Sequence, residues 1–354
     1  MSAYRDTYSM IDLSALKDNL HYIHETSKKP LMTIVKADAY GHGAIQVARI
    51  ASLMPYVEMF GVATLGEAIE LREQGITKGI LVLGAICEED LYLASQYDIS
   101  ICLYSLDYLQ RLISSKQSLK VHIKIDTGMN RLGFKSKEDF EKTLKLIQNN
   151  PAIIAEGVFT HYGAADEPND TYDRQFKRFK EIVQNHSFKY IHASNTAGAL
   201  YHHEDFTNMV RAGIAIYGIE PDGHEDTPLK QVMSLKTKVV MVKQIQKGEC
   251  VGYGFTYQAQ QDEYIATVPI GYADGIIRKN QDRYVYINGH EYQIVGRVCM
   301  DQMMLHVDKN VQVGDEVEIF GPHISLNRMA SELDTIPYEV LCLISLRVER
   351  KYID

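Results

Sequence analysis

The feature that most constrains this chain is an eightfold alternation of apolar runs and amphipathic segments between residues 7 and 219. The apolar runs have the length of strands buried on both faces, and the segments between them carry apolar residues at helical spacing. Eight such repeats predict a parallel sheet that closes into a (β/α)8 barrel. An open, doubly wound sheet is the alternative, but the GxGxxG fingerprint typical of its first turn is absent. The eight runs are LMTIV, MFGVAT, GILVLG, ISICLY, VHIKID, IIAEGVFT, YIHAS and VRAGIAIYG.

The pattern changes after about residue 222. A polar, turn-rich linker, PDGHEDTP, precedes segments that alternate apolar and polar residues and are separated by NG and GD turns. One helix is expected late, around SLNRMASELD. We therefore expect an α/β protein with an N-terminal barrel over residues 1–225, whose first few residues join the other domain. A mostly β domain is expected over residues 226–354.

Composition excludes several classes of function. The formal net charge of −9 leaves no electrostatic footprint for nucleic acid. No window of about 20 apolar residues could span a bilayer, and the start of the chain lacks the apolar core of a signal peptide. The five cysteines lack the CxxC spacing of a zinc site and do not indicate a disulfide framework. We expect a reduced, cytoplasmic, soluble protein without a metal.

Polar residues gather where the expected barrel strands end. Active sites of such barrels lie at the carboxyl ends of the strands and in the loops that follow. A single histidine or lysine there is weak evidence for a functional site, because either is often structural. The prediction therefore depends on several such residues together. The set consists of Lys36, Lys124, Asp126, Arg131, His161, His192, Ser194, Asn195 and Arg211.

The loops after the seventh and eighth strands predict a phosphate site. Barrels commonly bind phosphate there, with backbone N–H groups and hydroxyls. The loops read SNTAGAL and GIAIYG, and their candidate ligands are Ser194, Thr196, Gly213 and Ile214. The glycine-rich AYGHGA segment lacks the GK[ST] ending of a Walker-type loop.

Lys36 directly follows the apolar run LMTIV. Burial disfavours the charged form of a lysine, and the neutral amine is the form that attacks an aldehyde. With a phosphate site across the mouth, this lysine indicates pyridoxal 5'-phosphate (PLP), held as a Schiff base. The alternative is a lysine whose amine reaches solvent from the strand end, and spacing alone leaves it open.

Seven motifs in order resemble the alanine racemases, PLP-dependent enzymes with a barrel and a C-terminal β domain. The lysine motif and the barrel alone would also fit the PLP-dependent decarboxylases of basic amino acids. The motifs are VKADAYGHG, IDTGMNRLGF, HASNTAG, VRAGIAIYG, VGYGFTY, PIGYADG and GRVCMDQ.

The resemblance implies racemisation of alanine by two bases, which supplies D-alanine for cell-wall precursors. Lys36 would act on one face of the cofactor and Tyr253 on the other. The family builds its sites across a head-to-tail homodimer, so Tyr253 would come from the partner subunit. The cofactor-binding residues that the resemblance implies are Lys36, Tyr40, Arg131, His161, Ser194, Asn195, Thr196, Arg211, Gly213 and Ile214.

The resemblance also implies residues for the substrate and its access. Lys124 matches a lysine that many members carbamylate. Substrate-binding residues would be Arg131, Met300 and Asp301, and the access corridor would be lined by Tyr272, Arg278 and Arg297.

Two positions depart from the family pattern. Asp38 stands where the family often has asparagine, and Leu346 stands where many members have a tyrosine that reaches the phosphate and the inner gate. The loss of that hydroxyl predicts a less polar gate. A racemase of broader specificity or for serine is therefore an alternative, as is a PLP-binding protein without turnover.

Overall fold

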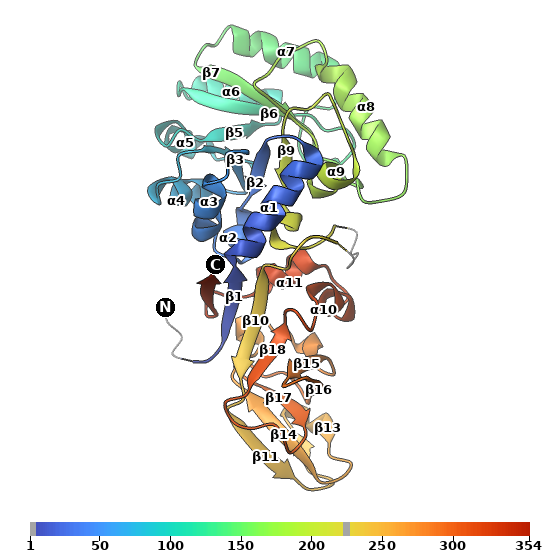
Figure 1. Cartoon of the computed structure of the whole chain (residues 1–354). Helices are drawn as coiled ribbons and strands as arrows, with labels where there is room; N and C mark the ends of the chain where they lie inside the picture. Colours follow the sequence, from blue (N-terminus) through green and yellow to red (C-terminus); the bar gives the residue numbers. More distant parts are fainter. Residues whose placement is uncertain (1–4, 222–226) are drawn as a thin grey trace. The chain divides into compact units, whose positions relative to one another are not determined.

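The computed structural model describes residues 5–221 and 227–354 (Figure 1). They form two compact units, here called the barrel unit and the β unit. Of the described residues, the barrel unit holds 17–39, 43–221 and 227–229, and the β unit holds 5–16, 40–42 and 230–354. The expected domain boundary at residues 225 and 226 involves positions outside the described residues and stays a prediction.

The barrel unit contains eight parallel strands in the order β8-β7-β6-β5-β4-β3-β2-β9 (Figure 1). A parallel bridge between His192 and Met209 joins the two ends of this sheet, so the barrel is nearly closed. The predicted α/β class with an N-terminal barrel is confirmed. The strands are β2 (Leu31–Ile34), β3 (Val57–Val62), β4 (Gly79–Val82), β5 (Ser100–Leu103), β6 (Leu119–Lys124), β7 (Ile153–Phe159), β8 (Tyr190–His192) and β9 (Val210–Ala212).

Helices follow the strands and bury one apolar face against them. In α6, Tyr108, Leu109 and Leu112 are buried, and the Ser105 side chain caps the helix by accepting a hydrogen bond from the Tyr108 N–H. The helices that begin in this unit or lead into it are α1 (Leu13–Ser27), α3 (Ala44–Ser52), α4 (Leu65–Glu73), α5 (Leu91–Gln96), α6 (Leu106–Ser114), α7 (Lys137–Gln148), α8 (Thr171–Val183) and α9 (Thr196–Tyr201).

The eighth apolar run is only partly a strand. β9 ends at Ala212, and a 3-10 helix, Ile214–Tyr217, follows it. Gly213 between them has φ −111° and ψ −110°, which is not a strand conformation, so the chain leaves the sheet there. The Tyr217 hydroxyl then donates to the Ile34 carbonyl at 2.9 Å, which ties this helix to β2.

The segment after Lys36 is a left-handed helical turn, α2 (Lys36–Tyr40). Ala37, Asp38, Ala39 and Tyr40 have φ between 52° and 54°. Each L-residue in that region costs about 1–2 kcal/mol, so the surrounding structure must hold the turn in place. The sequence analysis did not predict the handedness of this turn.

The β unit contains a nine-stranded sheet in the order β11-β14-β17-β16-β15-β18-β10-β1-β19 (Figure 1). β1 and β19 pair in parallel, whereas the other neighbours pair antiparallel. The predicted mostly β C-terminal domain is confirmed. The strands are β1 (Tyr8–Asp12), β10 (Met233–Lys238), β11 (Met241–Ile245), β14 (Glu263–Val268), β15 (Tyr284–Ile287), β16 (His290–Val295), β17 (Met303–Val307), β18 (Glu316–Phe320) and β19 (Glu349–Ile353).

Two helices accompany this sheet. The predicted late helix is α10 (Leu326–Glu332), which the Ser325 side chain caps by accepting from the Arg328 N–H. A second one, α11 (Pro337–Leu343), was not predicted. In the described residues of both units, no helix combines the length and apolar character that a membrane span requires.

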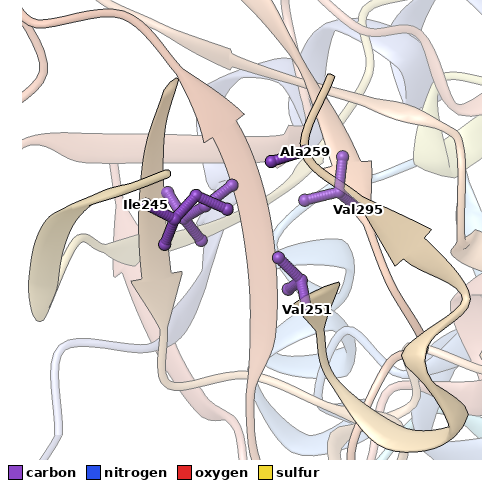
Figure 2. Packing of buried hydrophobic residues seen from close by; sticks show 5 residues of the cluster. Ile245, Val251, Ala259 and Val295 are labelled. Atoms are coloured by element: carbon purple, nitrogen blue, oxygen red, sulfur yellow. The ribbon is translucent and has the colours of Figure 1, made fainter. Parts of the chain in front are cut away.

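A short hairpin, β12 (Cys250–Val251) and β13 (Tyr257–Gln258), is anchored by a buried apolar cluster. Val251 and Ala259 lie at its two ends and are almost fully buried. Burial of a valine or isoleucine side chain stabilises by about 1.5–3 kcal/mol, so the cluster holds the hairpin firmly. Figure 2 shows Ile245, Val251, Ala259 and Val295 of this cluster, which also includes Ile265.

Candidate active site

Positively charged side chains converge on His161 at the carboxyl ends of the barrel strands. His161 follows β7, and burial together with the nearby cations lowers the pKa of its imidazole well below the ordinary value. The ring is therefore neutral at pH 7. The cations are, in order of their effect, Arg211, Lys124, Arg131 and Lys36. A site that gathers like charges in this way fits an anionic ligand.

Several hydrogen bonds hold the side chain of Arg211, which lies in β9. Its Nη2 donates to the carbonyl oxygens of Ala193 (2.7 Å) and Thr160 (2.8 Å), and it also lies 3.2 Å from Nδ1 of His161. Its Nη1 lies 2.9 Å from Nδ1 of His192. Within the described residues, Nε makes no hydrogen bond. This donor is available to an acceptor such as a ring nitrogen.

Lys124 ends β6 and is buried. Burial, and then the fields of Arg211 and Arg131, lower the pKa of its amine to about 7. The amine lies 4.4 Å from the centroid of the Phe159 ring, which offers it a cation–π contact. A substantial neutral fraction is therefore expected at pH 7.

The loop that carries Arg131 folds back on the end of β6. The Phe134 N–H donates to the Lys124 carbonyl, and the Asp126 N–H donates to the Phe134 carbonyl, both at 2.9 Å. Gly133 is required because its φ is +126° and a Cβ would lie 2.7 Å from the Asp126 nitrogen. Arg131 is exposed and has no hydrogen bond or ion pair among residues 5–221 and 227–354.

The two loops of the expected phosphate site lie together. The Gly213 N–H donates to Oγ1 of Thr196 at 3.0 Å, which joins the loop after β9 to the start of α9. Ser194 and Ile214 are buried beside them in the chain. The Asn195 side chain accepts from the Gly198 N–H at 3.0 Å and so caps α9. The Gly213 N–H and the side-chain oxygen of Asn195 are thus already engaged in hydrogen bonds within the chain.

Glu67 supports the segment around Lys36, and the sequence analysis did not single it out. Its Oε1 accepts from the Ala37 N–H at 2.7 Å. Its Oε2 accepts from the N–H groups of Ala63 (2.7 Å) and Thr64 (3.1 Å), as part of the capping box of α4. One carboxylate thus connects the turn after β2 to the start of α4. The T-x-x-E pattern of a capping box could have revealed it.

Asp38, the first departure from the family pattern, has a structural role in the barrel unit. Its Oδ1 accepts from the Ala44 N–H at 2.7 Å, at the first residue of α3. Its carbonyl also accepts from the Gly43 N–H at 3.0 Å. Asp38 therefore fastens the left-handed turn to the helix that follows.

Tyr40, which belongs to the β unit, is buried. Burial raises the pKa of its phenol, so the hydroxyl is a proton donor at neutral pH. Its ring lies 5.9 Å from the ring of Tyr338. A buried neutral phenol has the chemistry of a phosphate ligand, and that role stays a prediction.

Tyr253 lies at the turn of the β12–β13 hairpin, between Gly252 (φ +72°) and Gly254 (φ +71°). Its side chain is 72% exposed. A Cβ at position 254 would lie 2.7 Å from Nη1 of Arg297, so the Arg297 guanidinium packs directly against this turn. The structure thus brings together two of the β-unit residues that the sequence singled out.

The motifs PIGYADG and GRVCMDQ also meet in the β unit. The Tyr272 N–H donates to the Cys299 carbonyl, and the Ala273 N–H donates to the Met300 carbonyl, both at 3.0 Å. A Cβ at Gly271 would lie 2.4 Å from the Cys299 oxygen, so this approach requires glycine. Exposed side chains of this region are Tyr272, Arg278, Met300, Asp301 and Leu346.

Arg347 joins these motifs, and the sequence analysis did not identify it. Its Nη2 lies 2.7 Å from Oδ1 of Asp301, and its Nε lies 3.5 Å from Oδ1 of Asp274. Asp274 is fully buried, and it also pairs with Arg5 and accepts from the Gly271 N–H at 3.0 Å. The neighbouring Leu346 side chain is 81% exposed.

No group of three or more histidine, cysteine, aspartate or glutamate side chains in the described ranges is arranged to hold a metal ion. The donors at the barrel mouth suit an anion instead. Nε of Arg211 and the Arg131 guanidinium, neither of which has a partner among the described residues, fit a phosphorylated, anionic aromatic ligand such as PLP.

Fold and site together define a two-domain barrel protein with a cationic site at its strand ends. Family models cover most of the chain: "Alanine racemase, N-terminal domain" matches residues 11–221 and "Alanine racemase, C-terminal domain" matches residues 232–352. The chain belongs to the alanine racemase family, and the resemblance stated from its motifs is confirmed.

Individual relatives support this assignment over their whole length. Alanine racemase 1 of Bacillus subtilis is 41% identical, with 99% of this chain and 94% of the relative covered. The crystal structure of alanine racemase from E. faecalis has a TM-score of 0.95 and 38% identity, and 99% of each chain is covered. A histidine racemase from Leuconostoc mesenteroides is also similar, with a TM-score of 0.92, 30% identity and 99% of each chain covered.

Proposed function

We propose that this chain is a PLP-dependent alanine racemase. The observation that carries the proposal is the set of cations around His161 at the barrel mouth, with Nε of Arg211 left without a partner by the described residues. The full-length similarity to proteins named alanine racemase supports the choice of reaction.

The residues around the mouth suit distinct parts of PLP. Arg211 would donate from Nε to the ring nitrogen and, because arginine keeps its proton, would leave that nitrogen unprotonated. Arg131 would bind the phenolic oxygen, with His161 near the ring. The phosphate would be bound by Tyr40, Ser194, Thr196 and Ile214, and Lys36 would form the covalent link. The Gly213 N–H, which donates to Oγ1 of Thr196, would orient that hydroxyl toward the phosphate.

Lys124 suits the carbamate that many members of the family carry. The neutral amine is the form that reacts with carbon dioxide, and the pKa of about 7 makes this form available. A carbamate would supply a negative charge to orient the Arg131 guanidinium.

Racemisation requires a proton to leave one face of Cα and another to arrive on the opposite face. When bound, PLP supplies the electron sink that weakens the Cα–H bond of the amino acid. Nζ of Lys36 would hold or release the proton on one face, and the phenolic oxygen of Tyr253 would do so on the other. Met300, Asp301 and Arg131 would bind the substrate carboxylate, and Tyr272, Arg278 and Arg297 would line its access corridor.

The chain would work as a head-to-tail homodimer in which Tyr253 reaches the site of a second copy. The large exposure of Tyr253 (72%) and Phe255 (73%) on an anchored hairpin supports this arrangement. Subunits of Lys36→Ala and Tyr253→Phe, each inactive as homodimers, should regain about a quarter of the wild-type activity when they are dissociated and reassociated together. No recovery from confirmed mixed dimers would contradict the shared site.

The direct test is turnover. Purified protein with PLP and L-alanine should form D-alanine, measured with D-amino acid oxidase. PLP binding without D-alanine would contradict the racemase and favour the PLP-binding protein without turnover. The cytoplasmic location and the supply of cell-wall precursors stay predictions.

A second candidate is a racemase of broader specificity. The similar histidine racemase and Leu346, in place of a tyrosine, favour it. A panel of alanine, serine and histidine, compared by kcat/KM, separates the two. A higher kcat/KM for serine or histidine than for alanine would make the second candidate correct.

A further inference from the structure

We propose that Glu156, His122 and His192 form a directional chain of polar contacts that positions Arg211. Glu156 and His122 would then be positioning residues for a site that they do not touch. The inference rests on the proposed function only through the role of Arg211 toward the cofactor.

The chain of contacts runs through the interior of the barrel. Nη1 of Arg211 lies 2.9 Å from Nδ1 of His192, and Nε2 of His192 lies 2.9 Å from Nδ1 of His122. Nε2 of His122 faces Oε2 of Glu156 at 3.4 Å. That same carboxylate oxygen accepts from the Ser100 hydroxyl at 2.7 Å.

The two ends of this chain lie toward different ends of the strands. Ser100 is the first residue of β5, and Lys189, whose amine lies 3.8 Å from Oε1 of Glu156, directly precedes β8. The Glu156 carboxylate therefore lies toward the amino ends of the strands. Arg211 lies toward the mouth, beside His161, which follows the carboxyl end of β7.

The chemistry of the two ends decides the direction of every contact. A guanidinium only donates, so Nδ1 of His192 must accept, and its proton lies on Nε2. That N–H donates to Nδ1 of His122, whose own proton then lies on Nε2. This nitrogen lies 3.4 Å from Oε2 of Glu156 without hydrogen-bond geometry among the described residues, so the carboxylate acts on the ring through its charge. The same argument places the proton of His161 on Nε2, because its Nδ1 faces Arg211.

Both interior rings must be neutral for the chain to form. If His192 were protonated on both nitrogens, its Nδ1–H would face an N–H of Arg211. If His122 were, its Nδ1–H would face the Nε2–H of His192. In either case two donors would meet without an acceptor. Burial lowers the pKa of His122, and burial together with Arg211 lowers that of His192 well below its ordinary value. Burial alone would raise the pKa of Glu156, but His122 and Ser100 lower it to about 2, so the carboxylate is charged.

The barrel is shaped to hold the central ring. His122 pairs in register with Gly157 of β7, directly after a β-bulge at positions 121 and 122. A Cβ at Gly157 would lie 2.5 Å from Nδ1 of His122, so the strand leaves a gap for the imidazole. Phe159 stacks on the His192 ring with centroids 4.8 Å apart and planes 10° apart. Both rings therefore have fixed orientations.

Charged groups lie near both ends of this series of polar contacts. Lys120 and Lys189 act on His122 and Glu156 from β6 and from the residue before β8. Lys124 acts on His192 from the carboxyl end of β6. Glu156 is the carboxylate that acts on His122, so its loss would leave this ring beside Lys120 and Lys189, whereas the field of Glu204 would still act on Arg211.

The first test reads the protons directly and is independent of catalysis. Nitrogen-15 NMR of the purified full chain, before and after addition of PLP, should show His192, His122 and His161 as neutral rings protonated on Nε2. His186, which lies 2.9 Å from Glu141 outside the barrel, serves as an assignment control through His186→Gln. A ring of His192 or His122 that is protonated on Nδ1, or on both nitrogens, overturns the proposal even if the protein racemises alanine.

The second test separates positioning from structural support. His122→Gln keeps an acceptor and a donor in one side chain, whereas His122→Phe keeps only the bulk. We expect His122→Phe to lower kcat for alanine by about 10-fold or more with little change in KM, and His122→Gln to restore most of it. Equal kcat for both folded variants overturns the positioning role. If His122→Phe does not fold, Glu156→Gln replaces it: the proposal expects a similar loss of kcat, and wild-type kcat overturns it.

Discussion

Two candidate residues of the barrel unit and two of the β unit differ in how firmly this chain holds their side chains, whereas the exposed Arg131 and the buried Tyr40 depart from this contrast. In the barrel unit, Arg211 is buried and bonded on both terminal nitrogens, and Lys124 is buried against Phe159. In the β unit, Tyr253 and Leu346 are 72% and 81% exposed, although the backbone that carries Tyr253 is anchored.

The two units therefore contribute to the site in different ways. The barrel unit arranges charge in advance, as electrostatic preorganisation requires. The β unit arranges a backbone and leaves its side chains uncovered, which is the arrangement expected of a surface that acts on another copy of the chain. Substitutions of Lys36 and Lys124 in the barrel unit, and of Tyr253 and Leu346 in the β unit, test this difference.

The largest effect is expected from Lys36→Ala in the barrel unit. Without its amine, the covalent link to PLP and one proton carrier are both lost. Racemisation of alanine should fall by at least about 10⁴-fold, the upper end of what one acid–base group supplies. Borohydride reduction followed by mass spectrometry should detect PLP on the peptide with residue 36 in the wild type alone. Lys28→Ala, on the surface, is the control, and labelled PLP at another lysine in the wild type would contradict the assignment.

Tyr253→Phe tests the β-unit side of the contrast. The phenol is lost while the anchored hairpin stays, so only proton transfer on one face should fail. In deuterated water, one enantiomer of alanine should still exchange its α-proton, whereas exchange from the other should fall by about 10²–10⁴-fold. Tyr284→Phe, an exposed tyrosine of the same unit, should exchange both enantiomers normally. Equal loss of exchange for both enantiomers of the Tyr253→Phe variant would argue against two bases.

Lys124 tests how strongly burial in the barrel lowers the pKa of a lysine. The pKa is about 7 in the folded chain against 10.5 in the unfolded chain, so the unfolded chain binds more protons between these values. Stability therefore falls as the pH falls from about 10 to about 7, by about 3–5 kcal/mol relative to Lys124→Met. Urea unfolding in buffer free of carbon dioxide measures this, with Lys145→Met as the exposed control. A pH-independent difference would mean that the lysine is not desolvated, and added bicarbonate should reduce the difference if a carbamate forms.

The smallest effect is expected from Leu346→Tyr. The side chain is exposed, so the free energy of unfolding should change by no more than about 0.5 kcal/mol. The added hydroxyl should narrow the gate and raise the ratio of kcat/KM for alanine over histidine by roughly 10-fold. Leu343→Tyr, a less exposed leucine of the same unit, is the control. An unchanged ratio would remove Leu346 as a determinant of specificity.

The eight strands and the cationic mouth could be predicted because each depends on a local pattern. Apolar runs mark the strands, and the residue after each run marks the mouth. Lys36, Lys124 and His161 were identified in this way, and the structure gathers them. The roles of individual residues came from the family resemblance and stay predictions.

The features that the sequence analysis missed depend on contacts between distant segments. Glu67 acts through the N–H of Ala37, 30 positions away, and Arg347 joins two motifs that lie about 46 and 73 positions before it. The handedness of the turn after Lys36 was missed because alanine and aspartate normally favour other conformations, and tertiary contacts override that preference.

That left-handed turn inverts the usual rules of mutational tolerance at positions 37–40. In an ordinary helix, replacement of alanine by glycine destabilises by about 0.5–1 kcal/mol, but here glycine at position 37 or 39 would relieve a backbone clash worth about 1–2 kcal/mol. A β-branched residue would be the least tolerated. A library built at positions 37 and 39 should therefore be enriched in glycine and asparagine, and its survivors would report the handedness of the backbone beside Lys36.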